Sequence, residues 1–268
     1  MKKKIFKWAK VIIIVYCVIG IAVYYLQDKM FYRPEVLAAD HRFNISIPHK
    51  ELNIPYSLES NISIVQFPAA DSVAKGVVLY FHGNRQNVER YAPLVPNWTR
   101  NNYEVWMIDY PGFGKSTGEF SEKMLYEWAL VFYKLARAKY ARDSIIIYGR
   151  SFGSGIAAQL AARRDCRRLI LETPYYSFTS LAQSWLLIYP MNQMMKLKLP
   201  TYKYLQEVTA PVTIFHGTDD GVIRHRHAKR LIPYLKEGDE FITIEGGNHN
   251  DLDKFEPYRL KLDSVLQR

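Results

Sequence analysis

Cysteine is scarce in this chain, and its scarcity excludes several covalent and metal-based explanations of the fold. Of the two cysteines, Cys17 lies in an N-terminal apolar run and Cys166 is alone in the rest of the chain. No disulfide can therefore form within the remainder of the chain. His225 and His227 are close in sequence, but no cysteine or suitably spaced histidine completes a metal site around them. We expect no metal and no cofactor.

Acidic residues are also few. The 268 residues include 36 Lys and Arg but only 26 Asp and Glu, which gives a formal net charge of +10. Basic clusters occur near 163–168 and 224–230, yet no nucleic-acid recognition motif accompanies them. We expect a solvated basic surface with some attraction to anionic lipid headgroups, and no nucleic-acid partner. The chain also lacks internal repeats and low-complexity linkers, so residues 35–268 are expected to form one domain.

The one long hydrophobic run lies near the N-terminus. It extends from Val11 to Leu26 without a charge, and five lysines precede it. Sixteen helical residues span about 24 Å, close to the hydrocarbon thickness of a bilayer. We expect a transmembrane anchor over 11–28, a cytoplasmic basic segment over 1–10, and the domain on the non-cytoplasmic side. A cleaved signal peptide is the rival interpretation, but no small-x-small cleavage site follows the run.

Beyond this run, short apolar segments alternate with helical patterns. The apolar segments are typical of strands in a parallel sheet covered on both faces, and residues 45–67 are expected to add antiparallel edge strands. The clearest helical pattern covers 122–140, and the last covers 254–267. The expected fold class is α/β, with a doubly wound, mostly parallel sheet.

A Gly-x-Ser-x-Gly turn at 149–153 is the strongest chemical signal. An apolar, β-branched run precedes Ser151 and a small-residue helical segment follows it, which is the pattern of a nucleophile elbow. Residues 114–118 match the same pattern around Ser116. That match follows a Pro-Gly turn and leads into polar residues, so we interpret it as a loop before a helix cap. Ser151 is the expected nucleophile.

Candidate partners for this serine occur downstream, in the order acid then histidine. Asp219 and Asp220 follow the strand pattern at 212–217, and His249 follows the strand pattern at 241–244. A serine nucleophile needs a base to accept its proton and a carboxylate to orient that base. His82 and His216 are expected to have structural roles. From local sequence alone, either aspartate could be the acid.

Five blocks in this order resemble the α/β-hydrolase superfamily of serine hydrolases, in particular the membrane-anchored branch similar to serine aminopeptidase-like hydrolases and depalmitoylases. The blocks are Leu79–Asn84, Asp109–Ser116, Gly149–Gly153, His216–Asp220 and Gly247–Asp251. The resemblance implies an α/β-hydrolase fold with a short cap over 175–205. It implies Ser151, Asp220 and His249 as catalytic triad, and backbone N–H groups of Asn84 and Phe152 as oxyanion hole.

The expected activity is hydrolysis of carboxylic esters or thioesters of acyl or lipid-like small molecules through an acyl-enzyme. The cap segment is short, aromatic and rich in methionine, which suits an apolar acyl pocket, although packing of a short helix would account for it equally. A peptidase or amidase using the same triad is one alternative. A non-catalytic binding protein on this fold is another.

Overall fold

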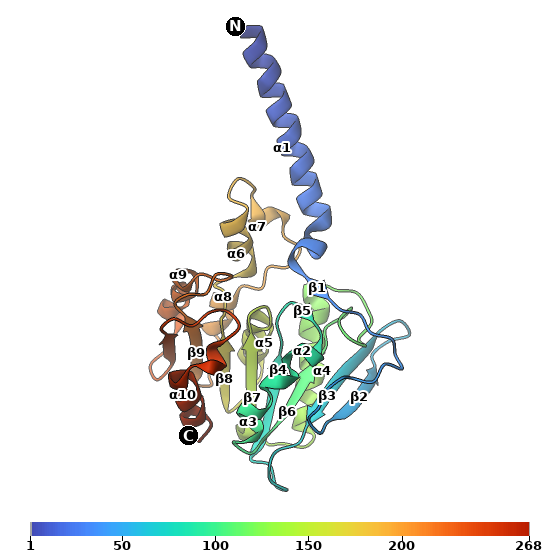
Figure 1. The fold of residues 1–268 in the computed structure, drawn as a ribbon, viewed down its shortest axis with the longest axis vertical. Coiled ribbons are helices and arrows are strands. Elements are labelled where there is room, and N and C mark those ends of the chain that lie inside the picture. Colours follow the sequence, from blue (N-terminus) through green and yellow to red (C-terminus); the bar gives the residue numbers. More distant parts are fainter. Residues whose placement is uncertain (1, 268) are drawn as a thin grey trace.

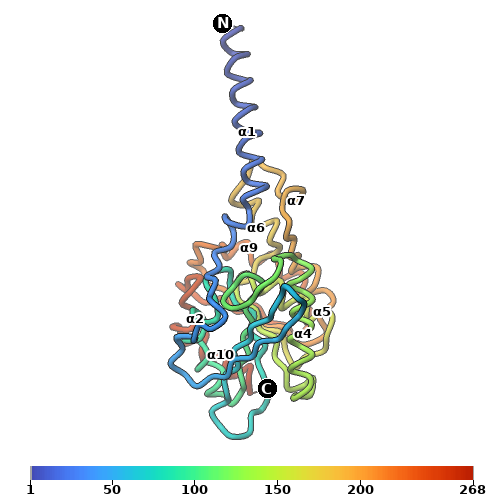
Figure 2. Tube along the Cα trace, turned by 90° about the vertical axis from the view of Figure 1, so that its right-hand side faces the viewer, coloured from blue at the N-terminus to red at the C-terminus, as the bar shows by residue number. Residues whose placement is uncertain are grey.

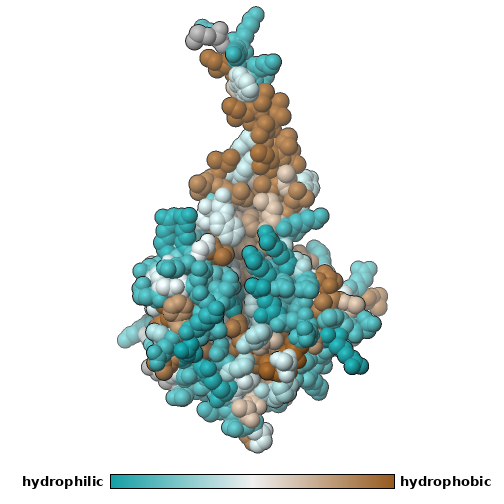
Figure 3. Space-filling view, in the orientation of Figure 1, coloured by the Kyte–Doolittle hydropathy of each residue, from teal (hydrophilic) through white to brown (hydrophobic). Residues whose placement is uncertain are grey.

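The computed structural model describes residues 2–267. Helix α1 (Lys2–Phe31) projects away from the rest of the chain, with the N-terminus at its far end (Figures 1 and 2). It is long and apolar enough to cross a membrane, judged by length and composition. Its 30 residues span about 45 Å. Most of its apolar side chains are exposed, and they form the brown band in Figure 3. The helix extends beyond the expected anchor, 11–28, at both ends.

The domain is built on an eight-stranded sheet whose strands have the order β10-β9-β8-β7-β4-β6-β3-β2 (Figure 1). Strand β3 is antiparallel to both its neighbours, and the other pairs are parallel. The expected parallel sheet with antiparallel pairing at one edge is confirmed. The strands are β2 (Lys50–Pro55), β3 (Asn61–Phe67), β4 (Gly76–Phe81), β6 (Tyr103–Ile108), β7 (Ile145–Arg150), β8 (Arg168–Glu172), β9 (Val212–Gly217) and β10 (Glu240–Ile244).

Helices cover both faces of the sheet and divide the core in two. Side chains of α4, α5, α6 and α8 belong to one buried apolar cluster, and those of α2, α3 and α10 belong to the other. Burial on both faces explains why the central strands are apolar throughout. The helices are α2 (Val88–Tyr91), α3 (Pro96–Thr99), α4 (Glu122–Arg137), α5 (Gly153–Arg163), α6 (Phe178–Trp185), α7 (Met191–Met194), α8 (Thr201–Leu205), α9 (His225–Ala228) and α10 (Glu256–Gln267); short 3-10 turns cover η1 (Ala92–Leu94), η2 (Arg142–Ser144), η3 (Lys229–Tyr234) and η4 (Leu252–Lys254).

Helix α4 illustrates how the local sequence specifies these elements. Ser121 caps its N-terminus, where the Ser121 hydroxyl accepts a hydrogen bond of 3.3 Å from the Met124 amide. The side chains of Leu125, Trp128 and Phe132 are buried on one stripe. The predicted helix therefore forms, although it ends at Arg137 rather than at 140.

A second, two-stranded sheet was not expected from the sequence. Strand β1 (Arg33–Pro34) follows α1, and it pairs in parallel with β5 (Arg85–Gln86), which follows β4. Asn84 adds to this junction, because its side-chain amide donates to the Phe31 carbonyl (2.5 Å) and its carbonyl accepts from the Arg33 amide (3.0 Å). These bonds attach the end of α1 to the loop after β4.

The 175–205 segment contains α6, α7 and α8 and packs against α1. The Tyr16 hydroxyl donates to the Ile188 carbonyl (3.0 Å), and the Tyr189 hydroxyl donates to the Tyr16 carbonyl (3.1 Å). The two tyrosine rings stack with centroids 4.8 Å apart. Further along, the Gln27 side-chain oxygen accepts from the Lys196 amide (2.9 Å). Helix α1 is thus attached to this segment at Tyr16 and at Gln27.

Candidate active site

Ser151 lies on a strained corner between β7 and α5. Its φ of 50° is in the left-handed region that residues with a side chain rarely adopt. The Ser151 amide donates to the Glu172 carbonyl (2.9 Å), and the Ser151 carbonyl accepts from the Ser154 amide (3.0 Å). The strand, the strained serine and the helix that define an elbow are all present.

The glycines on either side of Ser151 are required by close packing. A Cβ on Gly149 would lie 2.6 Å from the Cβ of Ala157, and a Cβ on Gly153 would lie 2.1 Å from the Phe81 carbonyl oxygen, whereas ordinary contact begins at 3.4 Å. Only glycine allows α5 to approach β7 and β4 this closely. The sequence pattern around Ser151 therefore has a steric explanation.

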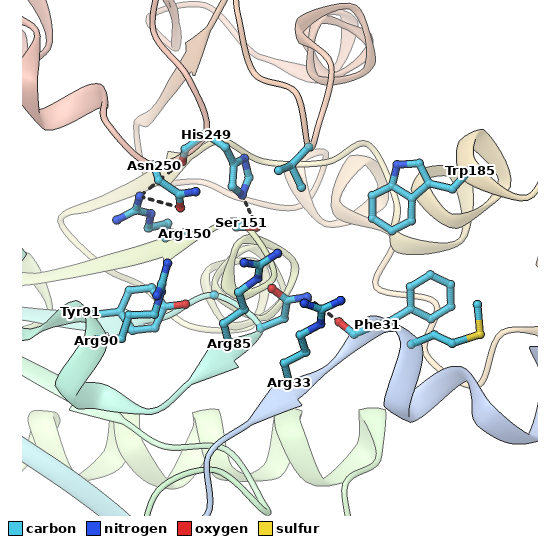
Figure 4. Close-up of a pocket in the computed structure, with 14 residues that line it drawn as sticks. Phe31, Arg33, Arg85, Arg90, Tyr91, Arg150, Ser151, Trp185, His249 and Asn250 are labelled. Atoms are coloured by element: carbon cyan, nitrogen blue, oxygen red, sulfur yellow. Dashed lines mark hydrogen bonds between the residues drawn. The ribbon is translucent and has the colours of Figure 1, made fainter.

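Asp220, His249 and Ser151 form one chain of short contacts. His249 Nδ1 is 2.7 Å from Asp220 Oδ2. On the other side of the ring, His249 Nε2 is 2.9 Å from Ser151 Oγ (Figure 4). The three residues follow strands β9, β10 and β7, so the carboxyl ends of the parallel strands bring them together. All three are buried. The contacts place a carboxylate on one imidazole nitrogen and a serine hydroxyl on the other.

The structure distinguishes between the two adjacent aspartates. Asp220 is buried, and its second carboxylate oxygen accepts from the amides of Val222 and Ile223, both at 2.8 Å. Asp219 is exposed, and its carboxylate accepts only from the neighbouring Thr218 hydroxyl (3.1 Å). The expectation from the resemblance that Asp220 faces His249 agrees with this geometry.

His216 supports the loop that carries this carboxylate. Its Nε2 is 2.8 Å from the Ile223 carbonyl oxygen and 3.4 Å from Asp220 Oδ2. Burial lowers the pKa of His216 to about 4, against the opposing effect of the Asp220 charge. A neutral His216 therefore donates one hydrogen bond to the loop, in the structural role expected for it.

The two proposed oxyanion donors belong to different elements around the cavity of Ser151. Phe152 is at the N-cap position of α5, where helix amide groups and the helix dipole favour negative charge. Asn84 follows β4 and lines the same cavity as Ser151. The oxyanion role of these two amides stays a prediction from the resemblance.

Comparison with known proteins identifies the family. The family model for serine aminopeptidase, S33, matches residues 72–206, which is half of the chain. The chain belongs to this family. The matched range contains Ser151 but ends before Asp220 and His249, so the acid and the base of this S33 chain rest on geometry and on the downstream motifs.

Curated relatives include α/β-hydrolase domain-containing proteins. Protein 17C from Xenopus tropicalis is 30% identical over 194 residues, which is 70% of this chain and 61% of that protein. Human protein 17B is 29% identical over 200 residues, which is 73% of this chain and 67% of that protein. The match thus leaves more than a third of the Xenopus protein uncovered.

Solved structures share the α/β-hydrolase fold. An esterase from Pyrococcus furiosus superposes with a TM-score of 0.68 at 15% identity, covering 89% of this chain and 98% of that one. A soluble variant of monoglyceride lipase from Saccharomyces cerevisiae superposes with a TM-score of 0.61 at 17% identity. This match covers 86% of the present chain and 98% of the lipase chain. At these identities the likeness establishes the fold.

The second Gly-x-Ser-x-Gly match in this S33 chain is structural. The buried Ser116 hydroxyl donates to the Asp109 carbonyl (2.7 Å) and accepts from the Ser63 amide (2.9 Å). The buried His82 has its Nδ1 2.7 Å from the Gly83 carbonyl oxygen, and its Nε2 lies 3.2 Å from the Asp109 carboxylate. Both residues stabilise loops, as the sequence suggested.

The histidines near 225 are less exposed than a solvated helix start would be. His225 Nε2 is 3.2 Å from the Thr243 hydroxyl, and His227 is only 8% exposed. Burial lowers the pKa of His227 to about 4, and the nearby Arg230 charge acts in the same direction. Within residues 2–267, no group of three or more His, Cys, Asp and Glu side chains is placed to hold a metal ion.

A buried network behind the site was missed by sequence reasoning. Glu172, at the end of β8, accepts from the hydroxyls of Tyr148 (2.7 Å) and Tyr258 (2.5 Å) and pairs with Arg150 Nε (3.3 Å). Arg150 in turn donates to the His249 carbonyl (3.3 Å). Although burial opposes ionisation, Glu172 raises the pKa of Arg150. The network joins the residue before the nucleophile to the histidine loop.

Ser151 and His249 open onto a cavity of about 250 Å³. Trp185 and Phe31 lie to one side of Ser151 in Figure 4, while Arg33 and Arg85 lie below it. The cavity thus combines an apolar wall with a cationic one. It is lined by Met30, Phe31, Arg33, Gly83, Asn84, Arg85, Arg90, Tyr91, Arg150, Ser151, Trp185, Val222, His249 and Asn250.

Proposed function

We propose that this chain is a membrane-anchored serine hydrolase that cleaves carboxylic esters or thioesters of acyl or lipid-like substrates. The observation that carries the proposal is the buried chain of contacts from Asp220 through His249 to Ser151, at 2.7 and 2.9 Å. A hydroxyl, an imidazole and a carboxylate in this order are the parts that acyl transfer through a serine requires. Membership of the S33 family agrees with it.

In the proposed mechanism, each of the three residues has its own role. With its Nδ1–H donated to Asp220, His249 presents an unprotonated Nε2 to the Ser151 hydroxyl. His249 accepts the serine proton as Ser151 Oγ attacks the acyl carbon, and the Asp220 carboxylate stabilises the imidazolium that forms. The imidazolium then protonates the leaving alcohol or thiol. Water, deprotonated by His249, hydrolyses the acyl-enzyme and releases the acid.

The negative charge that develops on the acyl oxygen needs fixed donors. The amide of Phe152 at the start of α5 and the amide of Asn84 after β4 are the candidates. The Asn84 loop is held on its other side by the Phe31 and Arg33 backbone. The end of α1 thereby supports the oxyanion loop directly.

The cavity walls favour an acyl substrate over a peptide with a free N-terminus. Apolar side chains of Met30, Phe31, Trp185 and Val222 form one wall. None of the described residues lining the cavity is acidic, whereas four are arginines. An ammonium group would therefore be repelled, and an apolar chain would be accommodated.

The proposed membrane anchor would bring this cavity to a bilayer surface. The proposed span is 11–28 of α1, whose apolar run ends at Leu26, and Tyr16 within it stacks on Tyr189. Leu187 and Ile188, in the loop beside Tyr189, are 77% and 70% exposed. Ten helical residues separate Tyr16 from Leu26, so this loop would enter the bilayer by about 15 Å. Acyl chains could then reach Ser151 from the lipid phase.

Hydrolysis by the full chain in detergent micelles tests the activity. We expect turnover of long-chain acyl esters and thioesters, none of aminoacyl amides, and loss of turnover in Ser151→Ala. Ser116→Ala is the matched control, because Ser116 has the same sequence motif without the contacts to histidine. Activity retained by Ser151→Ala, or turnover restricted to aminoacyl amides, would contradict the proposal.

The proposed topology has its own test. The N-terminal lysines predict a cytoplasmic N-terminus and a domain on the opposite side of the membrane. Protease added outside intact spheroplasts should digest the domain, and digestion only after lysis would overturn this orientation.

A further inference from the structure

Two arginines beside Ser151 occupy paired positions in the small sheet. Arg33 of β1 is the register partner of Arg85 of β5. Paired residues of neighbouring strands project from the same face of a sheet, and like charges placed opposite each other destabilise it. Two arginines at these paired positions therefore do not stabilise the short sheet, and their presence needs another explanation.

Neither guanidinium group is neutralised by the protein. Among the described residues, no carboxylate forms an ion pair with Arg33 or Arg85. The nearby Glu35 carboxylate instead accepts from the Gln86 amide (3.1 Å). The carboxylate of Glu89 faces His41 (3.2 Å) and the Asn44 amide. Two positive charges are left for a ligand.

Both arginines are fixed relative to the reacting centre. Arg85 follows Asn84 directly, and the Arg33 amide donates to the Asn84 carbonyl (3.0 Å). Both side chains line the cavity that contains Ser151, and Figure 4 shows them reaching toward it from the same side. A third arginine, Arg90, lines the cavity, and its guanidinium donates to the neutral Gln86 side chain (2.7 Å).

We propose that Arg33 and Arg85 form a subsite for a phosphate group on the leaving-group side of the substrate. Guanidinium groups bind phosphate oxygens in a bidentate manner, and a phosphate monoester carries about −1.5 to −2 charges at neutral pH, which matches two arginines. The apolar wall of Phe31 and Trp185 receives the acyl chain. This inference rests on the proposed function and narrows its substrates to acyl esters of phosphate-bearing alcohols.

A binding experiment that needs no turnover tests the subsite. The probe pair is an ether-linked 1-O-octadecyl glycerol 3-phosphate and the phosphate-free 1-O-octadecyl glycerol, titrated calorimetrically into the full chain in neutral micelles. We expect tighter binding of the phosphate lipid, and a loss of that preference by about ten-fold or more in Arg33→Gln/Arg85→Gln. Arg33→Lys/Arg85→Lys should retain part of it.

The matched control removes two charges elsewhere. Arg137 and Arg164 are exposed at the C-terminal ends of α4 and α5, and Arg137→Gln/Arg164→Gln should keep the full preference. Equal binding of the two ether lipids by the wild-type chain, or the same loss in both double variants, would overturn the subsite. Because the ether lipids are not hydrolysed, this result is independent of whether Ser151 is catalytic.

Hydrolysis of ester pairs then distinguishes a lipid from a soluble ligand. The pairs are 1-oleoyl glycerol 3-phosphate with 1-oleoylglycerol, and 1-butyryl glycerol 3-phosphate with 1-butyrylglycerol. Preference for phosphate in the oleoyl pair alone assigns the subsite to lipids, and preference in both pairs assigns it to phosphate esters in general. In either case Arg33→Gln/Arg85→Gln should lower the ratio of kcat/KM for the phosphate ester to kcat/KM for its phosphate-free partner. An unchanged ratio would refute the assignment while leaving the proposed hydrolase intact.

Discussion

Replacing Gly153 with alanine tests the close approach of α5 to β4 that positions Ser151. The added Cβ would lie 2.1 Å from the Phe81 carbonyl oxygen and 2.7 Å from the His82 carbonyl oxygen, both backbone atoms. Reaching ordinary contact, at 3.4 Å, requires α5 and β4 to separate by about 1 Å. We expect overpacking of this size to cost about 1–3 kcal/mol of stability.

The same displacement should also reduce the reactivity of Ser151. The β4 strand leads to Asn84 and the α5 helix begins beside Ser151, so separating them moves the proposed oxyanion donor away from the proposed nucleophile. A misplacement of about 1 Å lowers rates by about 100-fold. The assay is the second-order rate of fluorophosphonate inactivation, measured beside the thermal unfolding midpoint of the same sample.

Gly238→Ala is the matched control. Gly238 has no atom within 4 Å of an added Cβ, but its φ of +85° makes alanine strained, at a turn before β10. We expect this variant to lose about 1–2 kcal/mol of folding stability and to keep the wild-type rate of fluorophosphonate inactivation. If Gly153→Ala reacts as fast as wild type, or if Gly238→Ala slows as much as Gly153→Ala, the reasoning about the elbow is refuted.

Two further predictions concern the buried charged and titratable groups. Glu172→Gln leaves Arg150 buried without a counter-charge and should lower the free energy of unfolding by about 3–5 kcal/mol, measured by chemical denaturation. Adding Arg150→Met to the same chain should recover part of this loss. If the effects of the two substitutions on stability simply add, the pairing is contradicted. Because the pKa of His227 is lowered to about 4, the unfolded chain binds a proton that the folded chain does not between pH 6.5 and 4. Stability should therefore fall as pH decreases through this window, by about 2 kcal/mol at pH 5 from His227 alone. His227→Phe should flatten the profile of unfolding midpoint against pH, and an unchanged slope would contradict the assignment.

The parts of the fold set by local pattern were predictable. Apolar runs located the strands of the sheet, and the small residues around Ser151 located the elbow, because both depend on neighbours in sequence. Asp220 and His249 were candidates because each follows one of the last two strand patterns in the sequence. Choosing Asp220 over Asp219 rested on resemblance, since only the turn geometry shows which carboxylate is buried.

The parts set by distant contacts were not predictable. The pairing of Arg33 with Arg85 joins strands of two residues each, too short for any periodic signal. The role of Glu172 depends on Arg150 and on tyrosines from β7 and α10. The basic neighbours of His227 suggested a solvated position, but packing buries its side chain. In each case the decisive partner lies far away along the chain.

Fluorophosphonate labelling of the folded full chain, with mapping of the modified peptide, tests the central claim most directly. The account predicts a single adduct on Ser151, lost in Ser151→Ala and in His249→Ala but retained in Ser116→Ala. The absence of an adduct on the folded wild-type chain, or an adduct on Ser116, would contradict it.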